Sequence, residues 1–189
     1  MKPLESFIHT ETLDYDYLPF LKLLEDWSQI PDFPSQWKRA TVGSGQVTDK
    51  RSNYSFDLNA VLVADGYATH PVTVAFKELH LQVDDVVNKY KELHKIPLRF
   101  DNGWAVNRYL EGAEYVTHFD WSPLESRSVS VVLMLNDVEA GGDLVFPQQK
   151  VSVDAKAGNI AVFPSSYPFA HASMPVVSGV KYSLVSWLG

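Results

Sequence analysis

After Pro97 the sequence changes to short apolar or alternating runs divided by Gly, Pro, Asn and Asp, and this pattern constrains the fold more than any other feature. Runs of this kind predict β-strands joined by turns. Eight strands are expected, near residues 103–110, 113–118, 128–135, 143–146, 150–153, 159–163, 168–172 and 180–188. So many short strands in residues 99–189 indicate a double-stranded β-helix (jelly-roll) core.

Residues 1–98 are expected to support this core with helices and further strands. Two segments carry apolar residues at helical spacing, one within residues 15–28 and one following His70-Pro71. The first set is Tyr17, Leu18, Leu21, Leu24 and Trp27, and the second is Phe76, Leu79, Val83, Val86, Val87, Tyr90 and Leu93. The second helix fits a partner or membrane surface, or, as we expect, one side of the sheet. We therefore treat residues 1–189 as a single domain, mainly β with supporting α-helices.

Two shorter segments of the first half carry weaker signals. Residues 4–9 predict a strand. Residues 31–52 hold prolines and glycines among polar residues, which predicts a long surface loop and a candidate lid. Within that loop Gly43-x-Gly45 lacks the third glycine of a nucleotide-binding motif, so a flexible turn is the better interpretation.

Composition excludes several classes of protein. The chain contains no cysteine, which rules out disulfides, iron–sulfur clusters and thiol nucleophiles. A formal charge of −7 argues against a nucleic-acid partner, because phosphate binding needs net Lys and Arg on one face. The absence of a signal peptide and of a long apolar run predicts a cytoplasmic protein with no membrane partner. The oligomeric state leaves no trace in the sequence.

The six histidines fall into two groups. His9, His70, His80 and His94 lie among polar residues, so we expect them on solvated surfaces. His118 lies two residues before Asp120, and residues i and i+2 of a strand point to the same side. By itself His-x-Asp is weak evidence, because it occurs by chance and a surface pair is the usual explanation.

His171 lies in an apolar strand, where a buried core histidine is the alternative interpretation. Together with His118 and Asp120 it makes two imidazoles and one carboxylate, the facial triad of non-haem Fe(II) oxygenases. Such an oxygenase needs an electron-rich cosubstrate such as 2-oxoglutarate, whose distal carboxylate needs a buried cation. Lys181, ten residues after His171, is the only charged residue between His171 and the C-terminus. The alternative places Lys181 on the outer face of its strand.

Residues 109–187 resemble the catalytic domain of Fe(II)/2-oxoglutarate dioxygenases, in particular the prolyl 4-hydroxylase branch. The resemblance rests on motifs that occur in the family's order. These are Tyr109-x-x-Gly112-x-x-Tyr115-x-x-His118-x-Asp120, the strand Leu133–Val138 with Gly141-Gly142-Asp143 and Phe146-Pro147, Lys156-x-Gly158-Asn159-x-Ala161-Val162-Phe163, His171-x-x-x-Pro175-Val176, and Gly179-x-Lys181-Tyr182 with Trp187.

The resemblance implies that His118, Asp120 and His171 bind Fe(II) and that Lys181 binds 2-oxoglutarate, with a hydroxyl from Tyr109. Arg127 and Trp187 match positions that line the substrate side in the family. We therefore expect Arg127 to act with the catalytic residues and Trp187 to border the cosubstrate pocket. A surface charge at a strand edge is the alternative for Arg127. The implied reaction uses O2, with ascorbate as reductant, and hydroxylates an unactivated C–H bond with release of succinate and CO2.

The substrate implied by the resemblance is a prolyl residue in a peptide, with a free amino acid or other small molecule as the alternative. A cupin-like or lectin-like binding module without turnover is a second alternative, because the same barrel supports both. Three departures from the family pattern concern this question. The Gly-Gly turn continues with Asp143-Leu144, so the family's threonine is missing, the loop from Trp121 to Ser126 is short, and the sequence ends two residues after Trp187.

Overall fold

The computed structural model describes residues 4–42 and 45–189, so Gly43 of the predicted turn lies outside the described residues. The helices are α1 (Leu18–Trp27), α2 (Leu58–Leu62) and α3 (Pro71–His94), with short 3-10 helices η1 (Leu4–Phe7) and η2 (Tyr167–Phe169). The strands are β1 (His9–Thr12), β2 (Lys38–Arg39), β3 (Tyr54–Asp57), β4 (Asp101–Tyr109), β5 (Tyr115–His118), β6 (Val129–Met134), β7 (Ala140–Gly141), β8 (Leu144–Phe146), β9 (Val151–Val153), β10 (Asn159–Pro164), β11 (His171–Ser173), β12 (Val176–Ser178) and β13 (Lys181–Leu188).

The strands form a larger and a smaller sheet, with a short ribbon at one end. The larger sheet has the order β1-β10-β6-β13-β4-β3-β2, the smaller has the order β5-β11-β8-β9, and β12 pairs with β7 in the ribbon. All strand pairs are antiparallel. This arrangement confirms the predicted fold class, a jelly-roll core with supporting helices.

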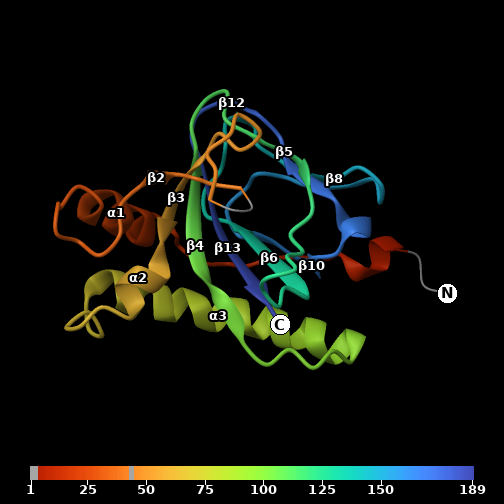
Figure 1. Ribbon diagram of the computed structural model, residues 1–189, viewed down its shortest axis with the longest axis horizontal. Helices are drawn as coiled ribbons and strands as arrows, with labels where there is room; N and C mark the ends of the chain where they lie inside the picture. Colours follow the sequence, from red (N-terminus) through yellow and green to blue (C-terminus); the bar gives the residue numbers. More distant parts are fainter. Residues whose placement is uncertain (1–3, 43–44) are drawn as a thin grey trace.

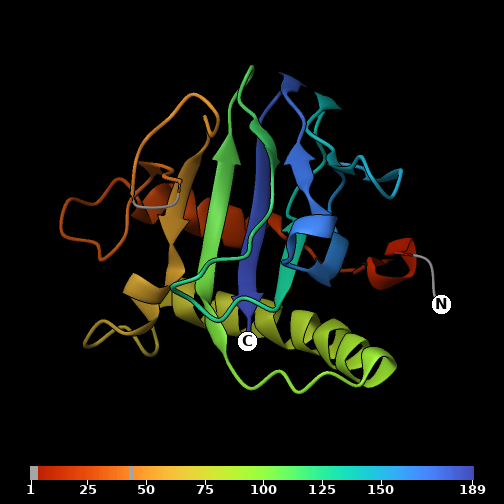
Figure 2. The same cartoon turned by 45° about the vertical axis from the view of Figure 1, so that its right-hand side comes forward.

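The helices cover one face of the larger sheet (Figures 1 and 2), and the opposite face carries the candidate site. Alternation along β13 shows the division. Lys181, Ser183 and Val185 line an internal cavity, whereas Leu184 and Leu188 belong to the core beneath the helices. Because successive side chains of a strand point to opposite sides, a single strand serves both the core and the cavity.

Helix α3 confirms the stronger of the two predicted helices. His70 caps its N-terminus, since the Nδ1 atom accepts a hydrogen bond from the Val72 N–H at 3.2 Å, and Pro71 occupies the first turn. The helix ends at Lys95, which adopts the left-handed conformation with φ 56°. Leu79 and Val83 are fully buried, so the apolar face packs against the protein interior, as expected for a helix that covers a sheet.

One cluster of buried side chains contains residues of both halves of the chain. Leu24 from α1 and Leu79 from α3 belong to the same cluster as Val106 from β4 and Leu133 from β6. The first half also adds β1, β2 and β3 to the larger sheet. The helical half therefore shares its hydrophobic core with the strand-rich half.

Several local predictions are wrong. Residues 4–7 form η1, and the strand begins only at His9, because a short apolar run does not distinguish helix from strand. Residues 167–169 form η2 and β11 begins at His171; Pro168 has no N–H to donate to a sheet. Strands β2, β3, β7 and β12 and helix α2 are further elements that the periodicity did not indicate, because two to five residues carry little periodicity.

Side-chain exposure also departs from the predictions. Leu18 and Leu93 are 69% and 54% exposed, since they lie near the ends of their helices rather than on the buried face.

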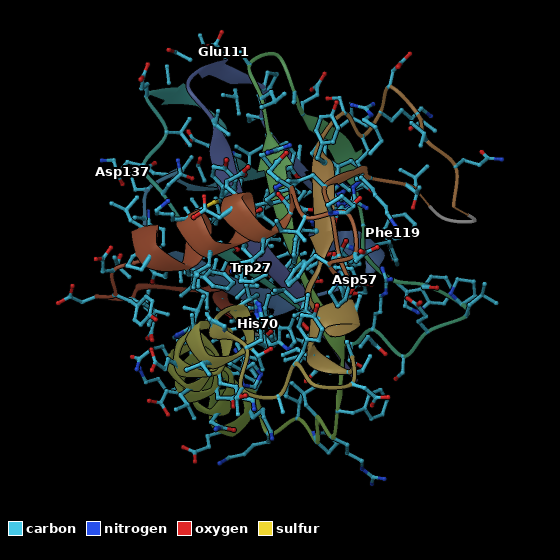
Figure 3. All side chains as sticks on the ribbon, turned by 90° about the vertical axis from the view of Figure 1, so that its left-hand side faces the viewer. Trp27, Asp57, His70, Glu111, Phe119 and Asp137 are labelled. Carbon is cyan, nitrogen blue, oxygen red and sulfur yellow. The ribbon has the colours of Figure 1, made fainter. Side chains whose placement is uncertain are left out.

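The four histidines of the first half contact aromatic rings instead of lying in solvent. His70 lies 4.3 Å from the Trp27 ring and His80 lies 4.9 Å from the Trp104 ring, centroid to centroid. Figure 3 shows Trp27 and His70 close together between α1 and α3.

Within the described part of the chain, no helix is both long enough and apolar enough to cross a membrane.

Candidate metal and cosubstrate site

Two neighbouring strands of the smaller sheet bring the candidate metal ligands together. His118 at the end of β5 lies directly opposite His171 at the start of β11 in the antiparallel pair. Asp120 follows β5 by two residues. One ligand atom from each of His118, Asp120 and His171 lies within 4.8 Å of the other two. The structure thus assembles the three residues that the sequence singled out.

Both imidazoles are oriented by the backbone of their own segment. The Nδ1 atom of His118 lies 2.9 Å from the carbonyl oxygen of Val116, and the Nδ1 atom of His171 lies 3.0 Å from that of Phe169. A carbonyl only accepts, so each Nδ1 donates its N–H, and in the neutral form of the ring the Nε2 is then the atom that keeps a free lone pair. The Nε2 atoms lie 3.5 Å and 3.6 Å from the two carboxylate oxygens of Asp120.

Asp120 is held in its ionised form. Burial raises the pKa of this carboxyl, but His171, His118 and the Ser130 hydroxyl lower it, and the net pKa lies well below the usual range. The Ser130 hydroxyl donates to Oδ2 at 2.7 Å and also contacts Ser165. Burial lowers the pKa of His171, which favours the neutral, metal-binding form of its ring.

This donor set fits a divalent transition metal. Two imidazoles and one carboxylate offer ligand atoms within 4.8 Å of one another, and each side chain has a supporting hydrogen bond behind it. Two histidines and one carboxylate on one face of an ion leave its remaining positions open, as in non-haem iron centres.

Lys181 lies inside the cavity rather than on the outer face of β13. Its side chain is 2% exposed, and its Nζ donates to the carbonyl of Gly142 and, at 2.7 Å, to the hydroxyl of Ser173. Burial lowers the pKa of Lys181 to about 7, against the opposing effect of the Asp143 carboxylate. A buried ammonium of this kind is costly without an anionic partner.

Tyr109 lies beside this lysine. The Nζ atom of Lys181 is 5.0 Å from the centroid of the Tyr109 ring, and Tyr109 is the cross-strand neighbour of Lys181 in the β4–β13 pair. Burial raises the pKa of Tyr109 to about 12, so its hydroxyl stays protonated and able to donate. The side chain of Leu144, where the family has threonine, also lines the cavity.

Arg127 and Trp187 lie at the mouth of the site. The guanidinium of Arg127 is 4.1 Å from the centroid of the Trp187 ring and forms an ion pair with Glu125. Its Nη1 also approaches the backbone carbonyl of Asp120 at 3.4 Å. Arg127 therefore lies next to the metal-ligating segment.

The site contains further residues to which the sequence analysis assigned no role. Tyr115 stacks on His118 with ring centroids 3.4 Å apart, and the Arg51 guanidinium lies 4.9 Å from the centroid of the Tyr115 ring. Asn107 and Ser183 face the same cavity from β4 and β13. Alternation from Tyr109 and Lys181 would have indicated Asn107 and Ser183, but no local signal indicates Arg51.

Comparison with known sequences and structures gives a consistent picture. Residues 104–189 match the sequence model of the 2OG-Fe(II) oxygenase superfamily. The chain is 27% identical over 139 residues to probable prolyl 4-hydroxylase 10 of Arabidopsis thaliana, covering 56% of this chain and 48% of that protein. The chain spans about half the length of the curated relatives it matches.

Two solved structures share the fold. One is a prolyl hydroxylase from Trichoplax adhaerens in complex with a hypoxia inducible factor peptide fragment, with a TM-score of 0.73, 17% identity, and coverage of 96% of this chain and 83% of that chain. The other is the viral collagen prolyl hydroxylase of Paramecium Bursaria Chlorella virus-1 in its 2OG complex, with a TM-score of 0.61, 16% identity, and coverage of 96% and 94%.

The sequence match covers the strands that carry the clustered histidines, the aspartate and the buried lysine, and the fold agrees over nearly the whole chain. Over residues 104–189 this chain is therefore similar to the 2OG-Fe(II) oxygenase superfamily, its curated relatives are prolyl 4-hydroxylases, and it shares the fold of solved prolyl hydroxylases.

Proposed function

We propose that this protein is an Fe(II)- and 2-oxoglutarate-dependent dioxygenase that hydroxylates an unactivated C–H bond, with a prolyl residue in a peptide as substrate. The observation that carries the proposal is the convergence of the His118, Asp120 and His171 ligand atoms within 4.8 Å, in the same cavity as the buried Lys181. The net reaction would convert R–H, 2-oxoglutarate and O2 into R–OH, succinate and CO2.

In this proposal His118, Asp120 and His171 hold the metal. Iron, when bound, supplies the activation of O2 that the side chains of the protein cannot provide. The chain itself contributes orientation, because the carbonyls of Val116 and Phe169 direct the two Nε2 atoms, and Ser130 positions the carboxylate of Asp120. These contacts keep the ligand set preorganised.

The cosubstrate would lie between the metal ligands and Lys181. The lysine ammonium would bind the distal carboxylate of 2-oxoglutarate, and the protonated hydroxyl of Tyr109 would add a second hydrogen bond. A carboxylate there would compensate the burial of the Lys181 charge, which otherwise has only a carbonyl and a hydroxyl as hydrogen-bond acceptors. The viral structural relative is a 2OG complex, which agrees with this assignment.

The peptide substrate would enter beside Arg127 and Trp187. The Trichoplax enzyme is in complex with a peptide fragment, and the relatives matched by sequence are prolyl 4-hydroxylases. Thr41 and Arg51 of the segment 31–52 line the same cavity as Arg127 and Trp187. We therefore keep the described residues of this segment as a candidate lid over the substrate. The stacked Arg127–Trp187 pair offers a flat surface to an extended, proline-containing chain.

The decisive experiment measures succinate after adding Fe(II), 2-oxoglutarate and ascorbate, and then screens a proline-rich peptide library by mass spectrometry for a gain of one oxygen. We expect 2-oxoglutarate-dependent succinate and a mass gain on proline. A non-catalytic binding module would give neither, and oxidation of small molecules alone would exclude the prolyl substrate.

Substituting the ligands tests the metal assignment. His118→Ala and Asp120→Ala are expected to abolish both iron binding and succinate formation while the circular dichroism spectrum stays native, because each removes one of three ligands. His80→Ala is a matched control, since His80 contacts Trp104 and lies outside the cavity. Full iron occupancy in the His118→Ala/Asp120→Ala double variant would contradict the assignment.

A further inference from the structure

Two open cavities adjoin the metal cavity, and together they are here called the groove. The two cavities share Thr41, Arg51 and Trp187. Arg51 and Trp187 also line the metal cavity beneath. The two arms of the groove therefore share residues with the metal cavity, so a chain bound along both arms would pass next to the candidate iron site.

One arm, here called the basic arm, is lined by Lys38, Arg51, Ser55, Asp57 and Ala105 among others. Its position follows from sheet register, since Lys38 pairs with Ser55, and Ser55 pairs with Asn107 of the metal cavity. These residues lie in one cross-strand row and share one face of the sheet. Lys38 thus projects on the side of the site rather than on the side of the helices.

The cations of the basic arm have no carboxylate partner among the described residues. Arg51 donates to neutral groups, namely the carbonyl of Thr41 at 2.8 Å and the amide oxygens of Asn53 at 3.1 Å and Asn107 at 3.4 Å. No ion pair of Lys38 or Arg51 occurs in residues 4–42 and 45–189. Asp57, the carboxylate of this arm, caps helix α2 by accepting from two backbone N–H groups.

The backbone holds Arg51 in place. Arg51 forms an isolated antiparallel bridge with Tyr115, and the carbonyl of the preceding Lys50 accepts from Val116 at 3.0 Å. The guanidinium lies over the Tyr115 ring, which also stacks on the metal-ligand candidate His118. Arg51 is therefore a preorganised cation close to the metal ligands.

The second arm, here called the aromatic arm, has a different chemistry. Besides the shared Arg51 it is lined by Phe119, Trp121, Leu124, Glu125 and Arg127, and Arg127 already pairs with Glu125. Phe119, Trp121 and Leu124 are 48%, 53% and 91% exposed. In Figure 3 Phe119 and Asp57, one from each arm, lie to the right of Trp27 and His70. Exposed rings next to a neutralised arginine suit an apolar side chain.

Building on the proposed function, we infer that the substrate peptide carries an acidic side chain on one side of the hydroxylated residue, bound by Arg51 and Lys38, and an apolar side chain on the other, bound by the aromatic arm. The net charge of −7 favours cationic peptides in the encounter, but the charge inside the groove has the opposite sign. Local contacts decide specificity.

The sheet geometry sets the spacing. Lys38 lies two strands away from Asn107, and neighbouring strands are about 4.8 Å apart, which gives roughly 10 Å. An extended peptide advances about 3.3 Å per residue. The acidic residue is thus expected within about three positions of the hydroxylated residue.

The experiment scans Asp through each position of a capped peptide with one central proline, with Asn at the same position as the uncharged match. Calorimetry measures affinity, and mass spectrometry measures hydroxylation. One Asp peptide within three positions of the proline is expected to have roughly tenfold lower Kd and KM than its Asn match. The advantage should shrink as salt is raised. Capped termini exclude a contribution from the peptide's own terminal carboxylate.

Variants assign the effect to residues. Arg51→Gln is expected to abolish most of the Asp-over-Asn preference, Arg51→Lys to keep part of it, and Lys38→Gln to reduce it about twofold because Lys38 is exposed. Lys50→Gln is the matched control: Lys50 is a cation next to Arg51 that lines neither arm, and its substitution should leave the preference unchanged.

The outcomes separate the two proposals. Equal affinity and turnover of the Asp and Asn peptides, or a preference that survives both Arg51→Gln and Lys38→Gln, would overturn the acidic-residue inference while leaving the dioxygenase proposal intact. Absence of 2-oxoglutarate-dependent succinate would overturn the dioxygenase proposal, and the calorimetric Asp-to-Asn comparison would still decide whether the groove binds acidic peptides.

Discussion

His118 and His171 are oriented by the same local contact, although they lie on different strands. In each case the Nδ1–H donates to the carbonyl two residues earlier in the chain, so that the free Nε2 faces the other ligands. Such a contact requires only a short stretch of backbone, and it defines the tautomer before any metal arrives. The ligand geometry therefore depends on residues within two positions of each histidine and on the pairing of β5 with β11.

Lys181 allows a direct test of the cosubstrate assignment. Lys181→Ala should raise the 2-oxoglutarate concentration required for turnover by roughly ten- to a hundredfold, because a charge-assisted hydrogen bond contributes about 1.5–3 kcal/mol. Iron binding should persist, and Lys181→Arg should restore the affinity only in part, since a planar guanidinium differs in shape from an ammonium. An unchanged 2-oxoglutarate requirement in Lys181→Ala would remove this lysine from the site.

The depressed pKa of Lys181 predicts a pH dependence of stability. Burial lowers this pKa from 10.5 to about 7, so between these two values the unfolded chain binds more protons than the folded protein. The contribution of Lys181 to the free energy of unfolding therefore rises with pH from about 7 to about 10. Urea unfolding should be measured for the wild type and for Lys181→Met across this range. The free energy of unfolding of the wild type minus that of Lys181→Met should increase with pH, and a constant value would contradict the predicted proton release.

At the scale of elements, the β7–β12 ribbon adjoins the backbone carbonyl that accepts a hydrogen bond from Lys181. Gly141 has φ 76° and pairs with Val176, and a Cβ on Gly141 would lie 2.3 Å from the carbonyl oxygen of Pro175. The next residue, Gly142, provides the carbonyl that accepts from Lys181. The Gly-Gly turn thus permits a close backbone approach that a larger residue would block.

A pair of glycines with the same φ isolates this steric effect. Gly112 also has φ 76°, but a Cβ there would meet nothing within 4 Å. Gly112→Ala is expected to lower the free energy of unfolding by about 1–2 kcal/mol, the cost of the left-handed conformation. Gly141→Ala adds a backbone clash and should cost about 1–3 kcal/mol more. Equal losses in urea unfolding would show that the ribbon adjusts freely around Gly141.

At the scale of the whole molecule, helix α3 and the strands share one buried cluster, which predicts cooperative unfolding of both halves. Leu79→Ala, at a fully buried position of α3, should destabilise the protein by about 2–5 kcal/mol. Leu81→Ala is the control on the same helix, since Leu81 is 64% exposed, and should change stability by less than about 0.5 kcal/mol.

The same experiment addresses domain organisation. If residues 1–98 and 99–189 form one domain, far-ultraviolet circular dichroism and tryptophan fluorescence should report one coincident transition in the wild type and in Leu79→Ala. Two separated transitions would mean that the helical half and the strand-rich half unfold independently.

The sequence by itself determined what depends on neighbours along the chain. Alternation and turn residues indicated most strands of the jelly roll, and helical spacing indicated α1 and α3. The spacing of His118 and Asp120 indicated that both point to one side of an extended segment. The charge of Lys181 within an apolar strand indicated a buried partner. Tertiary structure alone decided which strands pair, and therefore that His171 lies opposite His118, that Arg51 lies over Tyr115, and that Lys38 falls in line with Asn107. Register between distant strands depends on the packing of the whole sheet, so no local pattern of residues contains it.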